Sequence, residues 1–348
     1  MYSLIEMLRY KRPQGSSTQQ EFCERFLEPH FGLPDINGNY ILRIGDNPKI
    51  CFASHHDTVH KTEGLQKLVV TNNIVSVADP ATSSCLGADC TTGVWLMLGM
   101  IEAGIEGVYV VHAAEESGCV GSGALVKSNP YWLTHIDAVI SFDRYGDNSV
   151  ITHQMGRRTA SDDFAKSFAT ALDLPQLVAD TGGSYTDSNE YSDKVPECTN
   201  ISVGYYGQHG VNETQDLEYA DLLMYALTQA DWSKLVISRD PSMYEMHYDD
   251  DDFWSRWGSL SGKTYGNYNE PLDNYDTEDM HILVSEHPDL VTKMLIEMGF
   301  TPDLLIDEAK IESRSYTNDY VSRKNDYHPH DFYEENFHLE VAAARKKM

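Results

Sequence analysis

The feature that most constrains the fold is an alternation of strand-like and helix-like segments between residues 39 and 235. Short apolar runs predict buried strands, and the segments of helical spacing between them predict helices. The expected strands are 39–44, 49–54, 107–113, 137–142 and 200–205, with a hairpin over 67–78 that turns at Asn72-Asn73. The expected helices are 90–103, 161–172 and 216–235, with a short N-terminal helix that ends at Pro13. Such alternation predicts a three-layer α/β/α sandwich around a mixed, mostly parallel sheet.

Charge and composition exclude several classes of partner. The formal net charge of -28 argues against nucleic acid and against anionic membranes, because both require a basic surface. No segment approaches the roughly 20 apolar residues of a membrane span. The N-terminus lacks the basic start and apolar run of a signal peptide, so a cytoplasmic location is expected. The six cysteines form no CxxC pair, which favours reduced, unpaired thiols over disulfides or a cysteine zinc site.

The composition changes near residue 239. Residues 1–238 are expected to form the catalytic domain, and 239–276 an acidic, Tyr-rich linker or arm. A small helical unit is expected over 277–310, where Pro288 begins a helix and Gly299 ends it. The polar tail, 311–348, has no periodicity. The segment 240–348 is thus an extension that could bind a protein partner.

Five segments place metal-competent residues directly after predicted strands or at a helix start. Taken singly, each has an ordinary explanation, such as a helix cap for Asp89 or a solvated surface for a Glu-Glu pair. The carboxyl ends of strands in α/β sheets are, however, where ligand sites form. The segments are His55-His56-Asp57, Asp89, Glu115-Glu116, Asp143 and His209. Their joint occurrence predicts one polar, metal-binding site.

These segments carry five motifs that resemble those of the co-catalytic zinc exopeptidases. That family comprises aminopeptidases, carboxypeptidases and N-acyl amino acid deacylases that share one α/β catalytic domain. The motifs are SHHDTV (54–59), LGADCTTGV (86–94), AAEESGCVGS (113–122), ISFDRYG (140–146) and GQHG (207–210). They occur in the family order, and the resemblance covers roughly residues 35–235. Residues 240–348 have no counterpart in it.

The resemblance implies two zinc ions per chain and a ligand for each position. His55 and Asp143 would bind the first zinc, Glu116 and His209 the second, and Asp89 would bridge both. Imidazole and carboxylate ligands suit zinc on chemical grounds as well. His55 and His56 are adjacent, and only the HxD spacing selects His55 as the ligand.

Two further residues have implied catalytic roles. Asp57 would lie behind His55 and orient its imidazole. Glu115 would be the general base that takes a proton from the attacking water and gives it to the leaving amine. Adjacent residues of an extended segment point in opposite directions, so Glu116 can bind metal while Glu115 faces the substrate. Tyr191, Tyr205 and Tyr206 are candidates for a hydroxyl that stabilises the oxyanion.

The spacing of the motifs favours one branch of the family. Carboxypeptidase and deacylase members often insert a separate domain between the fourth and fifth motifs, whereas Asp143 and His209 are only 66 positions apart here. The expected function is therefore a zinc-dependent hydrolase, a metallo-exopeptidase that is most similar to an aminopeptidase and acts on a peptide. A carboxypeptidase or a deacylase of acylated amino acids is the alternative. A one-zinc acyltransferase and a non-catalytic scaffold that acts through residues 240–348 are further alternatives.

Overall fold

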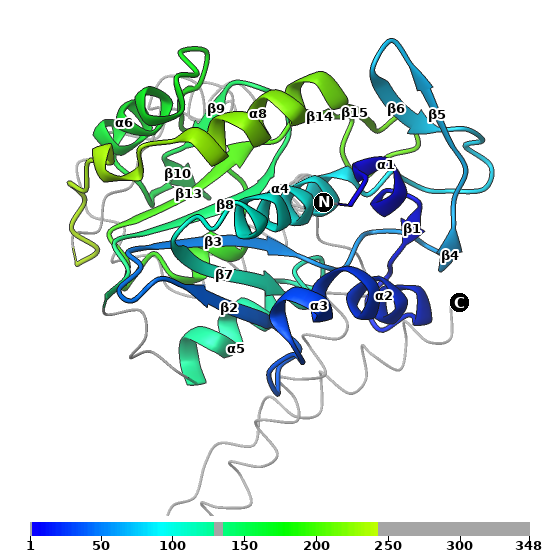
Figure 1. Cartoon of the computed structure of the whole chain (residues 1–348), viewed down its shortest axis with the longest axis horizontal. Coiled ribbons are helices and arrows are strands. Elements are labelled where there is room, and N and C mark those ends of the chain that lie inside the picture. Colours follow the sequence, from blue (N-terminus) through cyan, green and yellow to red (C-terminus); the bar gives the residue numbers. More distant parts are fainter. Residues whose placement is uncertain (1, 129–134, 243–348) are drawn as a thin grey trace, which may run out of the picture. The chain divides into compact units, whose positions relative to one another are not determined.

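The computed structural model describes residues 2–128 and 135–242 (Figure 1). The helical unit predicted over 277–310 and the tail 311–348 lie outside the described residues, as does most of the linker predicted over 239–276. Those three predictions therefore stay predictions, as does the boundary of the catalytic domain at residue 238.

The central element is a seven-stranded sheet with the strand order β12-β9-β13-β8-β3-β7-β2. Its strands are β2 (Tyr40–Ile44), β3 (Ile50–His55), β7 (Gly107–His112), β8 (Ala138–Arg144), β9 (Ser149–Ile151), β12 (Val178–Asp180) and β13 (Glu197–Ser202). The central neighbours β7, β3, β8 and β13 pair in parallel. The edge strand β2 is antiparallel to β7, and β9 pairs antiparallel with β13. The prediction of a mixed, mostly parallel sheet is confirmed.

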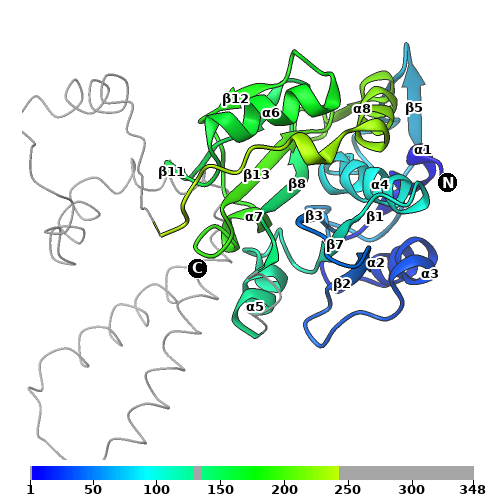
Figure 2. The same ribbon diagram turned by 60° about the vertical axis from the view of Figure 1, so that its left-hand side comes forward.

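Helices cover both faces of this sheet (Figures 1 and 2). One face carries α1 (Leu4–Met7), α4 (Ala88–Glu102), α6 (Asp162–Leu172) and α8 (Leu217–Gln229), and the other carries α5 (Val120–Ser128) and α7 (Asp187–Glu190). Because side chains alternate along a strand, Phe52 packs into one core while its neighbours Cys51 and Ala53 belong to the other. The three layers follow from strands that are apolar on both faces.

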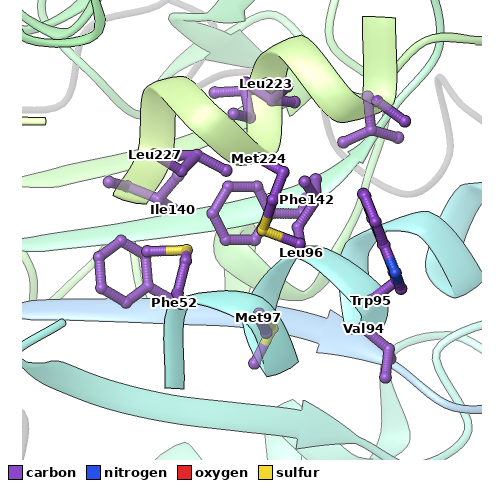
Figure 3. Close-up of a cluster of buried hydrophobic side chains, with 14 of the residues drawn as sticks. Phe52, Val94, Trp95, Leu96, Met97, Ile140, Phe142, Leu223, Met224 and Leu227 are labelled. Atoms are coloured by element: carbon purple, nitrogen blue, oxygen red, sulfur yellow. The ribbon is translucent and has the colours of Figure 1, made fainter. Parts of the chain in front are cut away.

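The larger core lies between the sheet and the helix pair α4 and α8. Figure 3 shows Leu223 and Leu227 of α8 above Phe142 and Ile140 of β8, with Val94 to Met97 of α4 beside them. Nearly every residue of α4 is buried, because the helix packs against β3 and β8 of the sheet and against the helices α8 and α1. An apolar helix of this kind is fixed in position by packing on all sides.

The N-terminal segment differs from its prediction. Only Leu4–Met7 is helical, and the chain then extends as β1 (Tyr10–Lys11), which pairs with β4 (Gly64–Leu65). The apolar residues that predicted a longer helix are buried, but a non-local strand pair satisfies the backbone beyond them. Three further short helices follow in a segment for which none was predicted: α2 (Ser17–Phe22), the π-helix η1 (Cys23–Leu27) and α3 (Glu28–Phe31).

A small four-stranded sheet has the order β14-β15-β6-β5. The predicted hairpin is confirmed as β5 (Leu68–Thr71) and β6 (Ile74–Val77), and both turn residues have positive φ, 50° at Asn72 and 64° at Asn73. The remaining strands are β14 (Tyr205–Tyr206) and β15 (Thr214–Asp216). The loop between β14 and β15 carries His209, so this sheet positions that residue.

Two predicted boundaries are wrong by several residues. The strand expected over 200–205 is β13, and it begins and ends three residues earlier, because residues 205–206 pair with the small sheet instead. The helix expected over 216–235 ends at Gln229, since Ala230 is extended, and a short 3-10 turn follows at Trp232–Lys234. A hairpin of β10 (His153–Gln154) and β11 (Arg157–Arg158) completes the strands. Within 2–128 and 135–242, no helix is both long and apolar enough to cross a membrane.

Candidate metal centre

The five predicted metal ligands lie together at the carboxyl ends of the central strands. His55 is the last residue of β3, and Asp143 lies near the end of β8. Glu116 follows β7 after a backbone turn in which Ala114 has φ 56°. Asp89 is in the first turn of α4, and His209 is in the loop between β14 and β15. Three segments at the carboxyl ends of central strands, one helix start and one loop of the small sheet thus contribute one side chain each.

The distances support two overlapping sets that share Asp89, and His55 also lies within 4.8 Å of ligand atoms of Glu115 and Glu116. In the first set, His55 Nε2 lies 3.7 Å from Asp143 Oδ1, and ligand atoms of His55 and Asp89 lie within 4.8 Å of each other. In the second set, His209 Nε2 lies 3.2 Å from Asp89 Oδ2 and 3.5 Å from Glu116 Oε1. The geometry thus places Asp89 between two groups, each with one histidine and one further carboxylate.

One buried carboxylate oxygen of the site lies near His209 Nε2 but accepts no hydrogen bond within the described part of the chain. Glu116 Oε1 is buried and has no hydrogen-bond partner. Leaving a carboxylate oxygen in this state is costly unless a cation binds it. The donors are imidazole nitrogens and carboxylate oxygens, which are common zinc ligands. The residues present therefore fit a pair of divalent ions.

Asp57 is completely buried and contacts three residues of the site. Its backbone oxygen lies 3.1 Å and its Oδ1 3.4 Å from His55 Nδ1, on the side of the ring away from Nε2. Its two carboxylate oxygens also accept the backbone N–H groups of Glu115 and Glu116, each at 3.1 Å. One carboxylate therefore orients the imidazole and fixes the backbone of both glutamates. The second of these functions is not evident from the HxD spacing.

Glu115 lies beside the first set without completing it. Its Oε2 is 3.8 Å from His55 Nε2, and the Cys119 thiol points to its other oxygen at 3.7 Å. Burial raises the pKa of Glu115 well above its usual value, and the neighbouring Asp143 raises it further. Burial and the adjacent Asp89 act in the same direction on the pKa of Glu116.

The ring of His56 is occupied by other contacts. Its Nδ1 lies 2.9 Å from Gln19 Nε2, and its Nε2 lies 3.2 Å from the Gly38 carbonyl oxygen. Burial lowers the pKa of His56 to about 4. Both ring nitrogens thus contact residues 19 and 38, which agrees with the choice of His55 as the ligand.

Three residues that support the site were not predicted. The Thr186 hydroxyl donates to Asp143 Oδ2 at 2.8 Å. The Glu213 carboxylate accepts three backbone N–H groups from residues 86–88, at 2.8 to 3.0 Å, directly before Asp89. Asp187 is buried, and its charge contributes to the raised pKa of Glu115. Residues 186 and 187 lie within the interval between Asp143 and His209, but neither they nor a lone Glu213 in a polar loop gives a sequence signal of its own.

The three tyrosine candidates occupy different environments. Tyr191 is fully buried, and its hydroxyl contacts His112 Nε2 at 3.1 Å. Tyr205 is also buried and donates to the backbone oxygen of Asp143 at 3.0 Å. Tyr206 is 42% exposed, so it alone of the three can reach a molecule outside the core.

The fold is the α/β fold expected from the motifs, and the clustered histidines and carboxylates resemble those of the co-catalytic metallo-exopeptidases. Residues 39–196 match the model of peptidase family M28. This match includes the first four of the five motifs and supports the resemblance, and with it the enzyme class, a metallo-exopeptidase. It ends before His209, so the last ligand position rests on geometry. None of the curated protein sequences matches the chain.

Solved structures share the fold at low sequence identity. The aminopeptidase PepT of Bacillus cereus ATCC 10987 is 14% identical, with a TM-score of 0.53 over 65% of this chain and 96% of that one. A tripeptidase of Staphylococcus aureus is 15% identical, with a TM-score of 0.51 over 65% and 95%. An aminopeptidase of the archaeon Desulfurococcus kamchatkensis is 12% identical, with a TM-score of 0.50 over 65% and 93%. These likenesses show the α/β fold.

Proposed function

We propose that the chain is an aminopeptidase that binds two zinc ions and removes residues from the free amino end of peptides. The observation that carries the proposal is the pair of ligand sets that share Asp89. His55 and Asp143 would hold the first ion, Glu116 and His209 would hold the second, and Asp89 would serve both. A bridging carboxylate between two histidine–carboxylate sets suits two ions about 3.5–4 Å apart.

The two ions would polarise the scissile carbonyl and acidify a water molecule. Side chains of the protein carry out the proton transfers and orient the ligands. Glu115 accepts a proton from the attacking water and returns it to the leaving amine, since it lies beside the ligands but is not needed to complete either set. Asp57 holds the His55 ring in orientation through Nδ1 and keeps the backbone of Glu115 in place.

The interval between Asp143 and His209 supports the aminopeptidase branch. It contains β9 to β14, α6 and α7, which belong to the main sheet and its cover, to the small sheet or to the β10–β11 hairpin. All of its residues are described, and none forms a separate domain over the site. A carboxypeptidase or deacylase is the second candidate, and a set of free-amine, N-acylated and C-terminally blocked dipeptides distinguishes it. Cleavage confined to N-acylated substrates would replace the proposal by a deacylase.

The test of the mechanism compares Glu115→Gln with Asp89→Ala in the zinc-loaded protein. Glu115→Gln keeps the shape of the side chain and should retain both metals, but lose about 10²–10⁴-fold in kcat because the proton transfer is lost. Asp89→Ala should instead lose metal, since that carboxylate serves both ions. Metal content by elemental analysis separates the two effects. A Glu115→Gln enzyme of nearly full activity would show that another group transfers the proton.

A further inference from the structure

A guanidinium group is fully buried directly behind the metal centre. Arg12 has no exposed surface, and it lies in the N-terminal segment before the part of the chain that matches the peptidase family. Its guanidinium stacks over the Phe22 ring, 3.9 Å from the ring centre. Burying an arginine removes its charge from water, and this desolvation is costly unless hydrogen bonds and packing compensate for it. Its contacts therefore indicate what it does.

The side chain of Arg12 joins the two segments that carry His55 and Asp89. Its Nε donates to the His56 carbonyl at 3.0 Å, between His55 and Asp57. Its Nη2 donates to Cys90 Sγ at 2.9 Å and to Thr91 Oγ1 at 2.8 Å. Cys90 and Thr91 directly follow Asp89 in the first turn of α4. One planar group thus fixes the turn after β3 relative to the start of α4.

The backbone of Arg12 strengthens the same connection. Its N–H donates to Thr58 Oγ1 at 3.0 Å, and its carbonyl accepts the Thr58 N–H at 2.9 Å. Gln19, from the same N-terminal segment, contacts the His56 ring. The segment that follows His55 is therefore held by residues 12 and 19 through its residues 56 and 58. These contacts leave His55 Nε2 free to face Asp89 and Asp143.

We propose that Arg12 is a positioning residue of the metal centre: its guanidinium sets the separation of His55 and Asp89. The proposal rests on the proposed two-metal function. The positive charge itself opposes cation binding, so any gain in metal affinity must come from geometry. Lysine cannot replace it, because an ammonium group lacks the planar fork that reaches a carbonyl and a hydroxyl in two directions. Partners that orient metal ligands in this way typically contribute about 10–100-fold in metal affinity.

The test measures the affinity for Zn²⁺ by competition with a chromophoric chelator, and records the absorption spectrum of the Co²⁺-loaded protein. Arg12→Met and Arg12→Lys should both bind the metal of the His55 set about 10–100-fold more weakly than the parent protein. The second metal, with Glu116 and His209, should weaken less. The Co²⁺ bands should change in the Arg12 variants because the ligand field of the first site changes. These readouts do not depend on peptidase activity, so failure of the proposed aminopeptidase function can be recognised separately.

Arg239→Met is the matched control. Arg239 is also buried, and its guanidinium donates to the backbone carbonyls of Ser192, Val195 and Pro196 at 2.8 to 3.2 Å. These three carbonyls lie just before β13, at the opposite end of the strand from the proposed ligands. The control should lose thermal stability yet keep both metal affinities and the Co²⁺ spectrum.

If Arg12→Met does not fold, Arg12→Lys, which retains the buried charge, decides the question. Zinc affinity in Arg12→Lys equal to or tighter than that of the parent protein would overturn the proposal, since the guanidinium would then act only as a charge or as ordinary packing. Equal weakening in Arg239→Met would overturn it as well, because loss of stability alone would then explain the effect.

Discussion

Gly93 of α4 is the position at which the packing of the helix on the sheet is most sharply constrained. A Cβ atom at Gly93 would lie 2.1 Å from the backbone oxygen of Phe142 and 2.5 Å from Ser54 Oγ. An ordinary contact begins at 3.4 Å, so α4 and β8 would have to separate by about 1.3 Å. The atom in the way is backbone, so no change of rotamer can relieve the contact.

Gly93→Ala should therefore destabilise the protein although alanine favours helices. Replacing glycine by alanine stabilises a helix by about 1 kcal/mol, whereas overpacking against a buried backbone atom destabilises the folded state by about 3 kcal/mol or more. A net loss of about 2 kcal/mol should lower Tm by about 4–8 °C in a domain of this size, measured without metal in the presence of a chelator. Asp89 lies one turn earlier on the same face of α4, so the variant should also bind zinc more weakly.

Gly123→Ala in α5 is the matched control for this prediction. Its Cβ would lie 3.1 Å from Glu190 Oε2, which is the end of a flexible side chain. The carboxylate can move aside, so this variant should be as stable as the parent protein or more stable by up to about 1 kcal/mol. Equal stability of the two alanine variants would refute the argument that α4 lies in backbone contact with β8.

Two further predictions concern pH and the C-terminal extension. Burial lowers the pKa of His60 from 6.5 to about 4, so the unfolded chain takes up its proton first. The neutral His60 therefore favours the folded state fully above pH 6.5, and this stability is lost as the pH falls towards 4, by about 3 kcal/mol at most. In His60→Gln, the free energy of unfolding measured in urea should fall less steeply with pH between 6.5 and 4. An unchanged dependence on pH would contradict the assignment. Removal of residues 240–348 should leave both metals bound, because every proposed ligand precedes residue 210. A folded but zinc-free truncated protein would show that the extension helps to build the site.

The local hydrophobic pattern of the sequence was sufficient to predict the strands and helices that are buried on both faces. β3, β7 and β8 are short apolar runs, and α4 has a clear stop at Gly104, where φ is 72°. Such patterns report burial directly, so the strands, the main helices and the layer order could be predicted from them. The placement of ligand-type residues after those strands then predicted that the side chains converge, because parallel strands end at one edge.

The elements that were missed depend on non-local contacts. β1 forms because Tyr10 and Lys11 pair with residues 64–65, and nothing in residues 1–14 indicates that partner. β13 is displaced because residues 205–206 join the small sheet. The supporting residues Arg12 and Glu213 are single charged residues in otherwise ordinary segments. Their function follows only from which backbone groups the fold brings within hydrogen-bond distance.

The metal centre is consequently assembled from more of the chain than the family match covers. Residues 39–196 supply four of the five proposed ligands, but His209 and Glu213 follow this segment and Arg12 precedes it. Glu213 binds the backbone before Asp89, while Arg12 binds the side chains after it. Asp89, the proposed bridging ligand, is thus held by residues from both flanks of the matched segment. Because a rigid helix start between two buried charged groups has little freedom to adjust, the position of Asp89 is set by the protein before any metal binds.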